Sequence, residues 1–165
     1  MKKKFIALTL LPLCFSVSAH PTPESLTEEI EHRGATAIVA GLYANEEKEW
    51  QYVTAKISKG ETSWLRVALL LAAGTDAASA ETLSSAVALA IPHNPDGVVN
   101  IMTDRYTSLS VRQVCSLPFY SMTEGELNQY VVSSIRALYK VAAGKNCLDT
   151  LVKTIGQSDG FNQDN

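Results

Sequence analysis

A nearly continuous apolar run occupies residues 64–73, in which Arg66 is the only polar side chain. A helix that is apolar on nearly all sides must be surrounded by other parts of a protein, because it offers no polar face to water. The run is also too short to cross a bilayer, which requires about 20 residues. The pattern therefore predicts a helix, ended by Gly74, near the centre of a core made by other helices.

Apolar residues recur at helical spacing on both sides of this run. The helices that the pattern predicts span residues 25–43, 45–59, 62–74, 79–91, 94–106, 123–144 and 147–155. The second of them is expected to be capped by Asn45, and the last two to turn Leu127, Val131, Ile135, Leu138 and Val152 inward. The sequence therefore predicts an all-α protein of about seven short helices, arranged as a bundle or a short helical stack.

Capping signals support several of these helix starts. Residues 25–28 (Ser-Leu-Thr-Glu) and 123–126 (Thr-Glu-Gly-Glu) match the capping box, in which a Ser or Thr accepts from the backbone and a Glu reaches back. Residues 94–96 (Asn-Pro-Asp) combine an N-cap with a proline at the first helical position. Two prolines within residues 20–24 predict an extended leader, and residues 107–122 are expected to be irregular.

The first 19 residues have the layout of a secretory signal peptide. A basic start at residues 2–4 precedes an apolar stretch at residues 5–15, and small residues follow at 17–19. We therefore expect cleavage after Ala19 and export to the periplasm. Cys14 raises the alternative of a lipoprotein, although the residues before it lack the small side chain that lipidation normally requires.

Removal of the signal peptide leaves a single helical domain, expected at residues 20–156, and a flexible tail at residues 157–165. The whole chain has 14 basic and 17 acidic residues, and its net charge of −3 becomes −6 because the signal peptide contains three lysines and no acid. An acidic chain without a basic cluster is poorly suited to nucleic acid or to an anionic membrane surface. We therefore expect no nucleic acid as a partner and no membrane span.

Two cysteines, Cys115 and Cys147, remain after the signal peptide is removed. An even number of cysteines in an exported chain favours a disulfide. A thiol nucleophile and half of a metal site are the alternatives, but the chain has no Cys-x-x-Cys motif and no histidine close to either cysteine in sequence. We therefore predict a Cys115–Cys147 bridge that ties the segment before residues 123–144 to the helix after them and so clamps a helical hairpin.

The order of the structural motifs resembles a family of small exported proteobacterial proteins whose function is uncharacterised. The residues that carry the resemblance are Ile57-Ser58-Lys59-Gly60, Trp64-Leu65-Arg66-Val67-Ala68, Asp76-Ala77, Leu83, Asn94-Pro95, Val114-Cys115 and Cys147. The resemblance implies an exported all-α domain and assigns no functional residue. In size, export and number of bridges the chain is also similar to helical immunity proteins of secretion-delivered toxins.

Familiar catalytic motifs do not occur in the sequence. It contains no Gly-x-Ser-x-Gly elbow, no phosphate-binding glycine loop, no zinc motif and no calcium loop. The spacing places His32 on the polar side of the first predicted helix and His93 in the turn before residue 94, where structural roles are expected. We therefore expect a protein that is not an enzyme and has no cofactor, with a hydrolase of unrecognised site as an alternative.

A small copper- or ligand-binding protein is a second alternative. Cleavage after Ala19 would make His20 the first residue, and its α-amine and imidazole could then chelate copper together. A second histidine, His32 or His93, would have to complete the site. Because nothing in the proline-rich leader is expected to hold His20, the three histidines are weak candidates and no metal site is predicted.

Aromatic side chains with a polar tip often anchor protein interfaces. The candidates for partner binding are Phe119 and Tyr120 in the irregular segment, together with Trp50 and Tyr52 on the second predicted helix. A place in the core is the alternative for Trp50, since it recurs at helical spacing. We therefore expect a periplasmic, non-catalytic protein-binding module, such as an immunity or inhibitor protein against a secreted toxin or hydrolase.

Overall fold

The computed structural model describes residues 20–44 and 46–157. The predicted signal peptide, the proposed cap at Asn45 and nearly all of the predicted tail lie outside the described residues. The elements of the described part are α-helices and short 3-10 turns, and none is a strand. The all-α prediction is therefore confirmed.

The described part of the chain has nine α-helices rather than about seven. Their bounds are α1 Pro23–Arg33, α2 Ala35–Tyr43, α3 Lys48–Ile57, α4 Thr62–Leu71, α5 Ala77–Leu89, α6 Pro95–Ile101, α7 Val111–Val114, α8 Glu124–Leu138 and α9 Lys145–Gly156. Three 3-10 turns join some of them, namely η1 Ala72–Gly74, η2 Thr107–Leu109 and η3 Ala142–Gly144. None of these helices is both long enough and apolar enough to cross a membrane.

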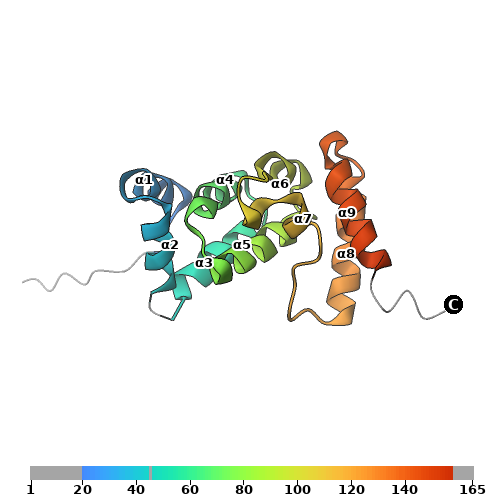
Figure 1. The fold of residues 1–165 in the computed structure, drawn as a ribbon, viewed down its shortest axis with the longest axis horizontal. Coiled ribbons are helices and arrows are strands. Elements are labelled where there is room, and N and C mark those ends of the chain that lie inside the picture. The colour runs from blue at the N-terminus through green and yellow to red at the C-terminus, as the bar shows by residue number, and fades with distance from the viewer. Residues whose placement is uncertain (1–19, 45, 158–165) are drawn as a thin grey trace, which may run out of the picture.

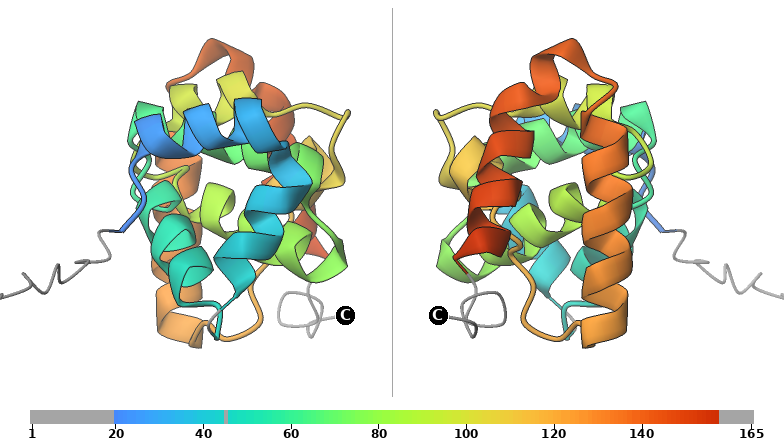
Figure 2. Two further views of the ribbon diagram at one scale, coloured as in Figure 1. Left: turned by 90° about the vertical axis from the view of Figure 1, so that its left-hand side faces the viewer. Right: turned by 90° about the vertical axis from the view of Figure 1, so that its right-hand side faces the viewer.

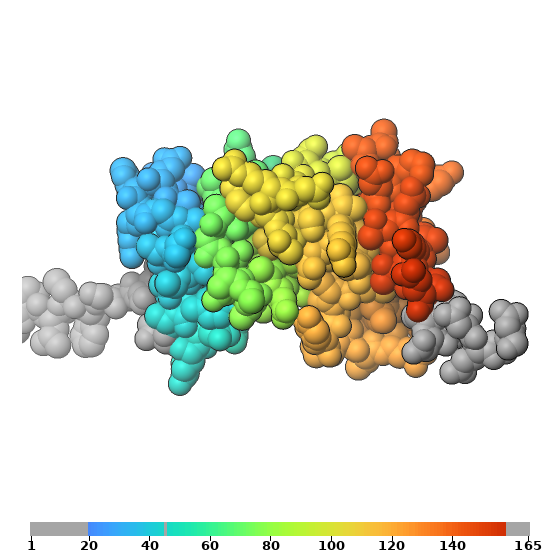
Figure 3. Space-filling model, in the orientation of Figure 1, coloured from blue at the N-terminus to red at the C-terminus, as the bar shows by residue number. Residues whose placement is uncertain are grey.

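The helices follow one another along the long axis of the molecule in nearly the order of the sequence (Figure 1). Helices α1 and α2 form one end, and α8 and α9 form the other, as the two end views show (Figure 2). The same progression is visible on the surface, where the colours run from blue to red along the molecule (Figure 3). Of the two predicted arrangements, the structure is closer to a short helical stack.

Helix α4 lies at the centre of this stack, as predicted. It contacts α1, α2, α3, α5 and α6. Five of its side chains are buried, namely Trp64, Leu65, Val67, Ala68 and Leu71. Leu69 and Leu70 are only partly buried and line a shallow cleft beside α1, so α4 is covered on most sides but not all.

The prediction of one helix over residues 25–43 is wrong, because two helices meet at Gly34. Gly34 has φ 81° and ψ 150°, a combination that is essentially restricted to glycine, so helix α1 ends there and α2 starts in a new direction. Gly74 lies close to this corner, since a Cβ atom at Gly74 would be 2.3 Å from the carbonyl carbon of Ala35. The break therefore allows η1 to pack directly on the backbone of α2.

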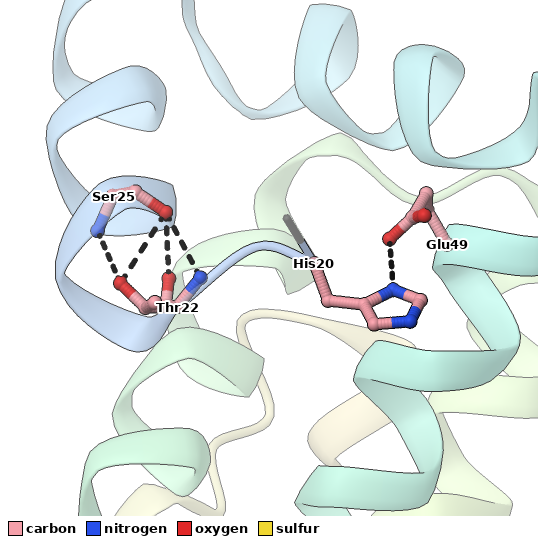
Figure 4. A network of polar contacts seen from close by, with 4 residues as sticks. All are labelled: His20, Thr22, Ser25 and Glu49. Atoms are coloured by element: carbon pink, nitrogen blue, oxygen red, sulfur yellow. Dashed lines mark hydrogen bonds and ion pairs between the residues drawn. The ribbon is translucent and has the colours of Figure 1, made fainter. Parts of the chain in front are cut away.

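The start of α1 also differs from the prediction. Pro23 occupies the first turn of the helix instead of an extended leader, which the missing N–H of proline allows. Thr22 is the N-cap, and its Oγ1 accepts from the backbone N–H of Ser25 at 3.2 Å (Figure 4). Ser25 therefore completes a capping box from within the helix, whereas Glu28 was expected to do so.

The predicted helix over residues 94–106 starts as expected and ends early. Asn94 caps α6 through its Oδ1, which accepts from Gly97 N at 2.9 Å. The helix ends at Ile101, because the next segment folds back and Thr103 N donates to Leu109 O at 3.0 Å. The prediction for residues 102–106 is therefore wrong.

The C-terminal end of the stack is a helical hairpin. Helix α8 ends at Leu138 and not near Gly144, and α9 packs back against it. Cys115, directly after α7, and Cys147, in the first turn of α9, form a disulfide with a Cα–Cα distance of 5.3 Å. The bridge therefore clamps the two segments that flank α8, as predicted.

The face of α8 that enters the core is shifted by about one residue from the predicted stripe. Leu138 is buried, as predicted, together with Tyr130 and Ser134, whereas the predicted Leu127, Val131 and Ile135 are only partly buried. The Tyr130 hydroxyl donates to Ala88 O at 3.0 Å, so α8 is tied to the end of α5. On α9, Val152 was predicted to point inward and is instead 52% exposed.

Candidate binding groove

An open groove of about 520 Å³ lies between α3, α5 and the segment of residues 117–122. We call it the α3–α5 groove. Its lining residues come from α3 (Gln51, Thr54, Ala55, Ser58), from α5 (Glu81, Thr82, Ser85, Ala86, Leu89) and from the segment (Phe119, Tyr120, Ser121, Met122). Most of the exposed lining surface is apolar. A concave, mainly apolar surface with a few polar groups is the usual form of a binding site.

Helix α3 forms one wall of the groove because one of its faces is buried in the core and another carries small and polar side chains. Trp50, Val53 and Ile57 are buried on one face, which anchors the helix in the core. The Trp50 indole Nε1 donates to Thr82 Oγ1 at 2.8 Å, and this bond joins α3 to α5 beneath the groove. A neighbouring side of α3 bears small and polar side chains, which leave the groove open.

The segment of residues 117–122 forms the third wall and is held in a compact shape. Leu117 has φ 59°, a left-handed conformation that turns the chain sharply. Phe119 N donates to Leu117 O at 2.7 Å, and the hydroxyl of Ser85 donates to Pro118 O. The segment is therefore attached to α5 as it runs toward the start of α8 (Figure 1).

The two aromatic residues of the segment have different environments. The Phe119 ring is partly buried and packs edge-on against Tyr130, with a centroid distance of 4.8 Å and an interplanar angle of 80°. Tyr130 is deep enough that burial raises the pKa of its hydroxyl to about 12. Tyr120 is 83% exposed at the edge of the groove. Phe119 therefore fixes the segment, and Tyr120 is available to a partner.

Among the described residues that line the groove, Glu81 is the only one with a charged side chain. It lies in the first half of α5 and is exposed. The remaining polar groups of the lining are hydroxyls and amides. The groove therefore combines an apolar surface with a single negative charge.

The other predicted binding residues lie elsewhere. Trp50 is 1% exposed, so it belongs to the core, as the alternative interpretation had it. Tyr52 is partly buried and does not line the groove. Its ring contacts Trp64 edge-on and stacks on the ring of His20. Of the four candidates, only Phe119 and Tyr120 are brought together at one site.

The structure keeps the three histidines of the chain in separate environments. His32 is exposed in the last turn of α1, and His93 is exposed directly before the Asn94 cap. His20 is held in place, contrary to expectation, because its Nδ1 lies 3.2 Å from Glu49 Oε2 on α3 (Figure 4). Within residues 20–44 and 46–157, no three His, Cys, Asp or Glu side chains are grouped as a metal site would require.

Several groove residues were not predicted from the sequence. Leu89 and Met122 provide apolar lining, and Ser85 attaches the segment. Leu89 is partly buried and lies off the predicted inward positions of α5, and a leucine that is not fully buried is by itself common in proteins. The proximity of Leu89 to Met122 depends on the path of residues 117–122, which no periodic pattern encodes.

Comparison of the chain with protein-family models, with curated proteins and with solved structures found no match. The resemblance to exported helical proteins and to immunity proteins therefore stays a prediction. Any function assigned to the chain rests on its own geometry.

Proposed function

We propose that this protein is a periplasmic, non-catalytic protein-binding module, and that its α3–α5 groove takes an amphipathic helix of a cationic partner protein. The observation that carries the proposal is Tyr120, which is 83% exposed at the edge of an apolar groove whose third wall is attached to α5. A tyrosine on a fixed segment offers a large contact area at a low cost in conformational entropy.

The shape of the groove favours a helical segment over an extended one. Its two long walls are α-helices, whose backbone groups are already paired within each helix, and no strand edge is present among the described residues to pair with an extended peptide. Helices are commonly bound by laying an apolar face into a groove between other helices. Ala55, Leu89 and Met122 provide the apolar contacts for such a face.

The charge of the groove favours a basic partner. Glu81 would face a Lys or Arg that flanks the apolar face of the bound helix. The sequence from residue 20 onward contains 17 acidic and 11 basic residues, so the long-range field also attracts a cationic protein. The predicted export, together with the disulfide, supports a partner in the same compartment, and we propose a secreted toxin or hydrolase that this protein inhibits or neutralises.

The test is capture of proteins from a periplasmic extract with the purified exported protein and two matched variants. Tyr120→Ala removes the groove tyrosine, whereas Tyr139→Ala removes a tyrosine that is equally exposed, at 82%, outside the groove. We expect a stoichiometric partner that the wild type and Tyr139→Ala retain and Tyr120→Ala loses. In a binding titration the loss should be about 30-fold, as for a hot-spot residue.

A second variant tests the charge. Glu81→Lys should weaken binding about tenfold at low salt and less at high salt, because salt screens the interaction between exposed charges. A partner that binds wild type and Tyr120→Ala equally would show that another surface is used. Phe119→Ala is less suitable, since the packing of Phe119 on Tyr130 also stabilises the fold.

A further inference from the structure

His20 lies in a defined position at the other side of α3, away from the groove. Its Nδ1 is 3.2 Å from Glu49 Oε2, and its ring stacks on that of Tyr52 with a centroid distance of 4.2 Å and an interplanar angle of 10°. The close-up shows the imidazole directed at α3 and the Glu49 carboxylate directed back at it (Figure 4). Two side chains from separate elements therefore place a nitrogen and an oxygen donor face to face.

The separation of these donors suits a metal ion. Two donor atoms that are each about 2.0–2.2 Å from one ion lie about 2.8–3.6 Å from each other when the angle between the two bonds is between the square value of about 90° and the tetrahedral value of about 109°. The observed distance of 3.2 Å falls in this interval. The Tyr52 ring fixes the plane of the imidazole, so that Nδ1 keeps its direction toward Glu49 when a metal replaces the proton between them.

Cleavage after Ala19 would add a third donor. The new α-amine of His20 and its Nδ1 can bind one metal ion together, because they belong to the same residue. The next backbone nitrogen cannot join them, since Pro21 has no N–H that a metal could displace. Chelation would therefore be restricted to His20 and leave Glu49 as the third ligand.

We propose that the mature N-terminus is a copper(II) site formed by the α-amine of His20, its Nδ1 and Glu49 Oε2. Two nitrogens and one carboxylate oxygen suit Cu(II), which also binds such ligands more tightly than the other divalent first-row ions. No second histidine is needed.

The test uses the exported protein, whose intact mass should correspond to a chain that begins with His20. Cu(II) is titrated against a competing chelator, and electron paramagnetic resonance reports the number of bound nitrogens. A form with one extra alanine before His20 keeps every side chain but moves the α-amine away. We expect one Cu(II) with two nitrogen ligands in the mature protein, and affinity about 100-fold weaker in the extended form and in His20→Ala.

Glu49→Gln should weaken Cu(II) binding about tenfold, and His32→Ala and His93→Ala should leave it unchanged, since these histidines lie elsewhere. Equal binding by the mature and extended forms would overturn the proposal, as would loss of binding in either histidine control. A mature mass that starts at another residue would overturn it too. Circular dichroism of each variant checks that the fold is intact.

Discussion

The aromatic residues with a polar tip divide according to whether that tip has a partner in the fold. The Trp50 indole donates to Thr82, the Tyr130 hydroxyl donates to Ala88 O, and both side chains are buried. Tyr120 and Tyr139 are more than 80% exposed. A buried polar tip is costly without a hydrogen bond, so the partner decides which aromatic residue can be core and which is left for the surface.

Thr82→Val should therefore destabilise the protein by about 1–3 kcal/mol, because it leaves the buried indole N–H of Trp50 without its acceptor at 2.8 Å. Thr150→Val is the matched control, since among the described residues the Thr150 hydroxyl donates to Asn146 O in its own helix and to no side chain of another helix. Urea unfolding measures both. Trp50→Phe added to Thr82→Val should cost less than the sum of the single changes, and strict additivity would contradict a direct interaction.

At the scale of the element, the same substitution, glycine to alanine, should have opposite effects on stability at two positions. At both Gly34 and Gly125, a Cβ atom would have no atom within 4 Å apart from its chain neighbours and its own helix backbone, so the two sites differ mainly in backbone conformation. Gly34→Ala should destabilise by about 1–3 kcal/mol, because alanine disfavours φ 81° and ψ 150°. Gly125→Ala, within α8, should stabilise by about 0.4–1 kcal/mol. Thermal unfolding of both variants checks whether each change raises or lowers stability. A Gly34→Ala variant as stable as the wild type would contradict the argument that the corner between α1 and α2 requires glycine.

The capping box of α8 should make stability depend on pH. Hydrogen bonds from the backbone and hydroxyl of Thr123 lower the pKa of Glu126 below its ordinary value of 4.5. The stabilisation is therefore complete above pH 4.5 and is lost as the pH falls through the folded pKa. Glu126→Gln should lower the Tm at pH 7 and differ less from wild type at pH 3. Glu124→Gln, in the same turn, is the control, and an equal effect there would indicate the helix dipole instead.

Features that depend on a few neighbouring residues could be predicted from the sequence. The Asn94 cap, the Thr123 capping box and the apolar centre of α4 are of this kind, and all three are confirmed. The corner at Gly34 could not be predicted, because a helical pattern continues through it and only the φ of Gly34 reveals the break. The groove was missed for a related reason, since its third wall depends on a hydrogen bond between Ser85 and Pro118.

At the scale of the whole molecule, both proposed sites involve α3, whereas the hairpin of α8 and α9 forms the C-terminal end of the stack. Helix α3 has Gln51 and Thr54 in the groove and Glu49 beside His20, so one helix serves both proposed sites from different sides. The hairpin of α8 and α9 lies at the far end and contacts the stack mainly through α6 and α7. Each element therefore depends most on its neighbours along the axis, as in other stacked folds.

Loss of the disulfide should consequently affect one end of the molecule more than the other. Cys115→Ser with Cys147→Ser opens a loop of 32 positions and should cost about 3–4 kcal/mol in urea unfolding. Amide hydrogen exchange should become faster in α9 and α8 before it does in α4, which has helices on most sides. Residues 117–122 lie inside the opened loop, so binding at the α3–α5 groove should weaken as well. Equal acceleration of exchange in α4 and α9 would show that the stack unfolds only as one unit, and that the bridge stabilises it globally.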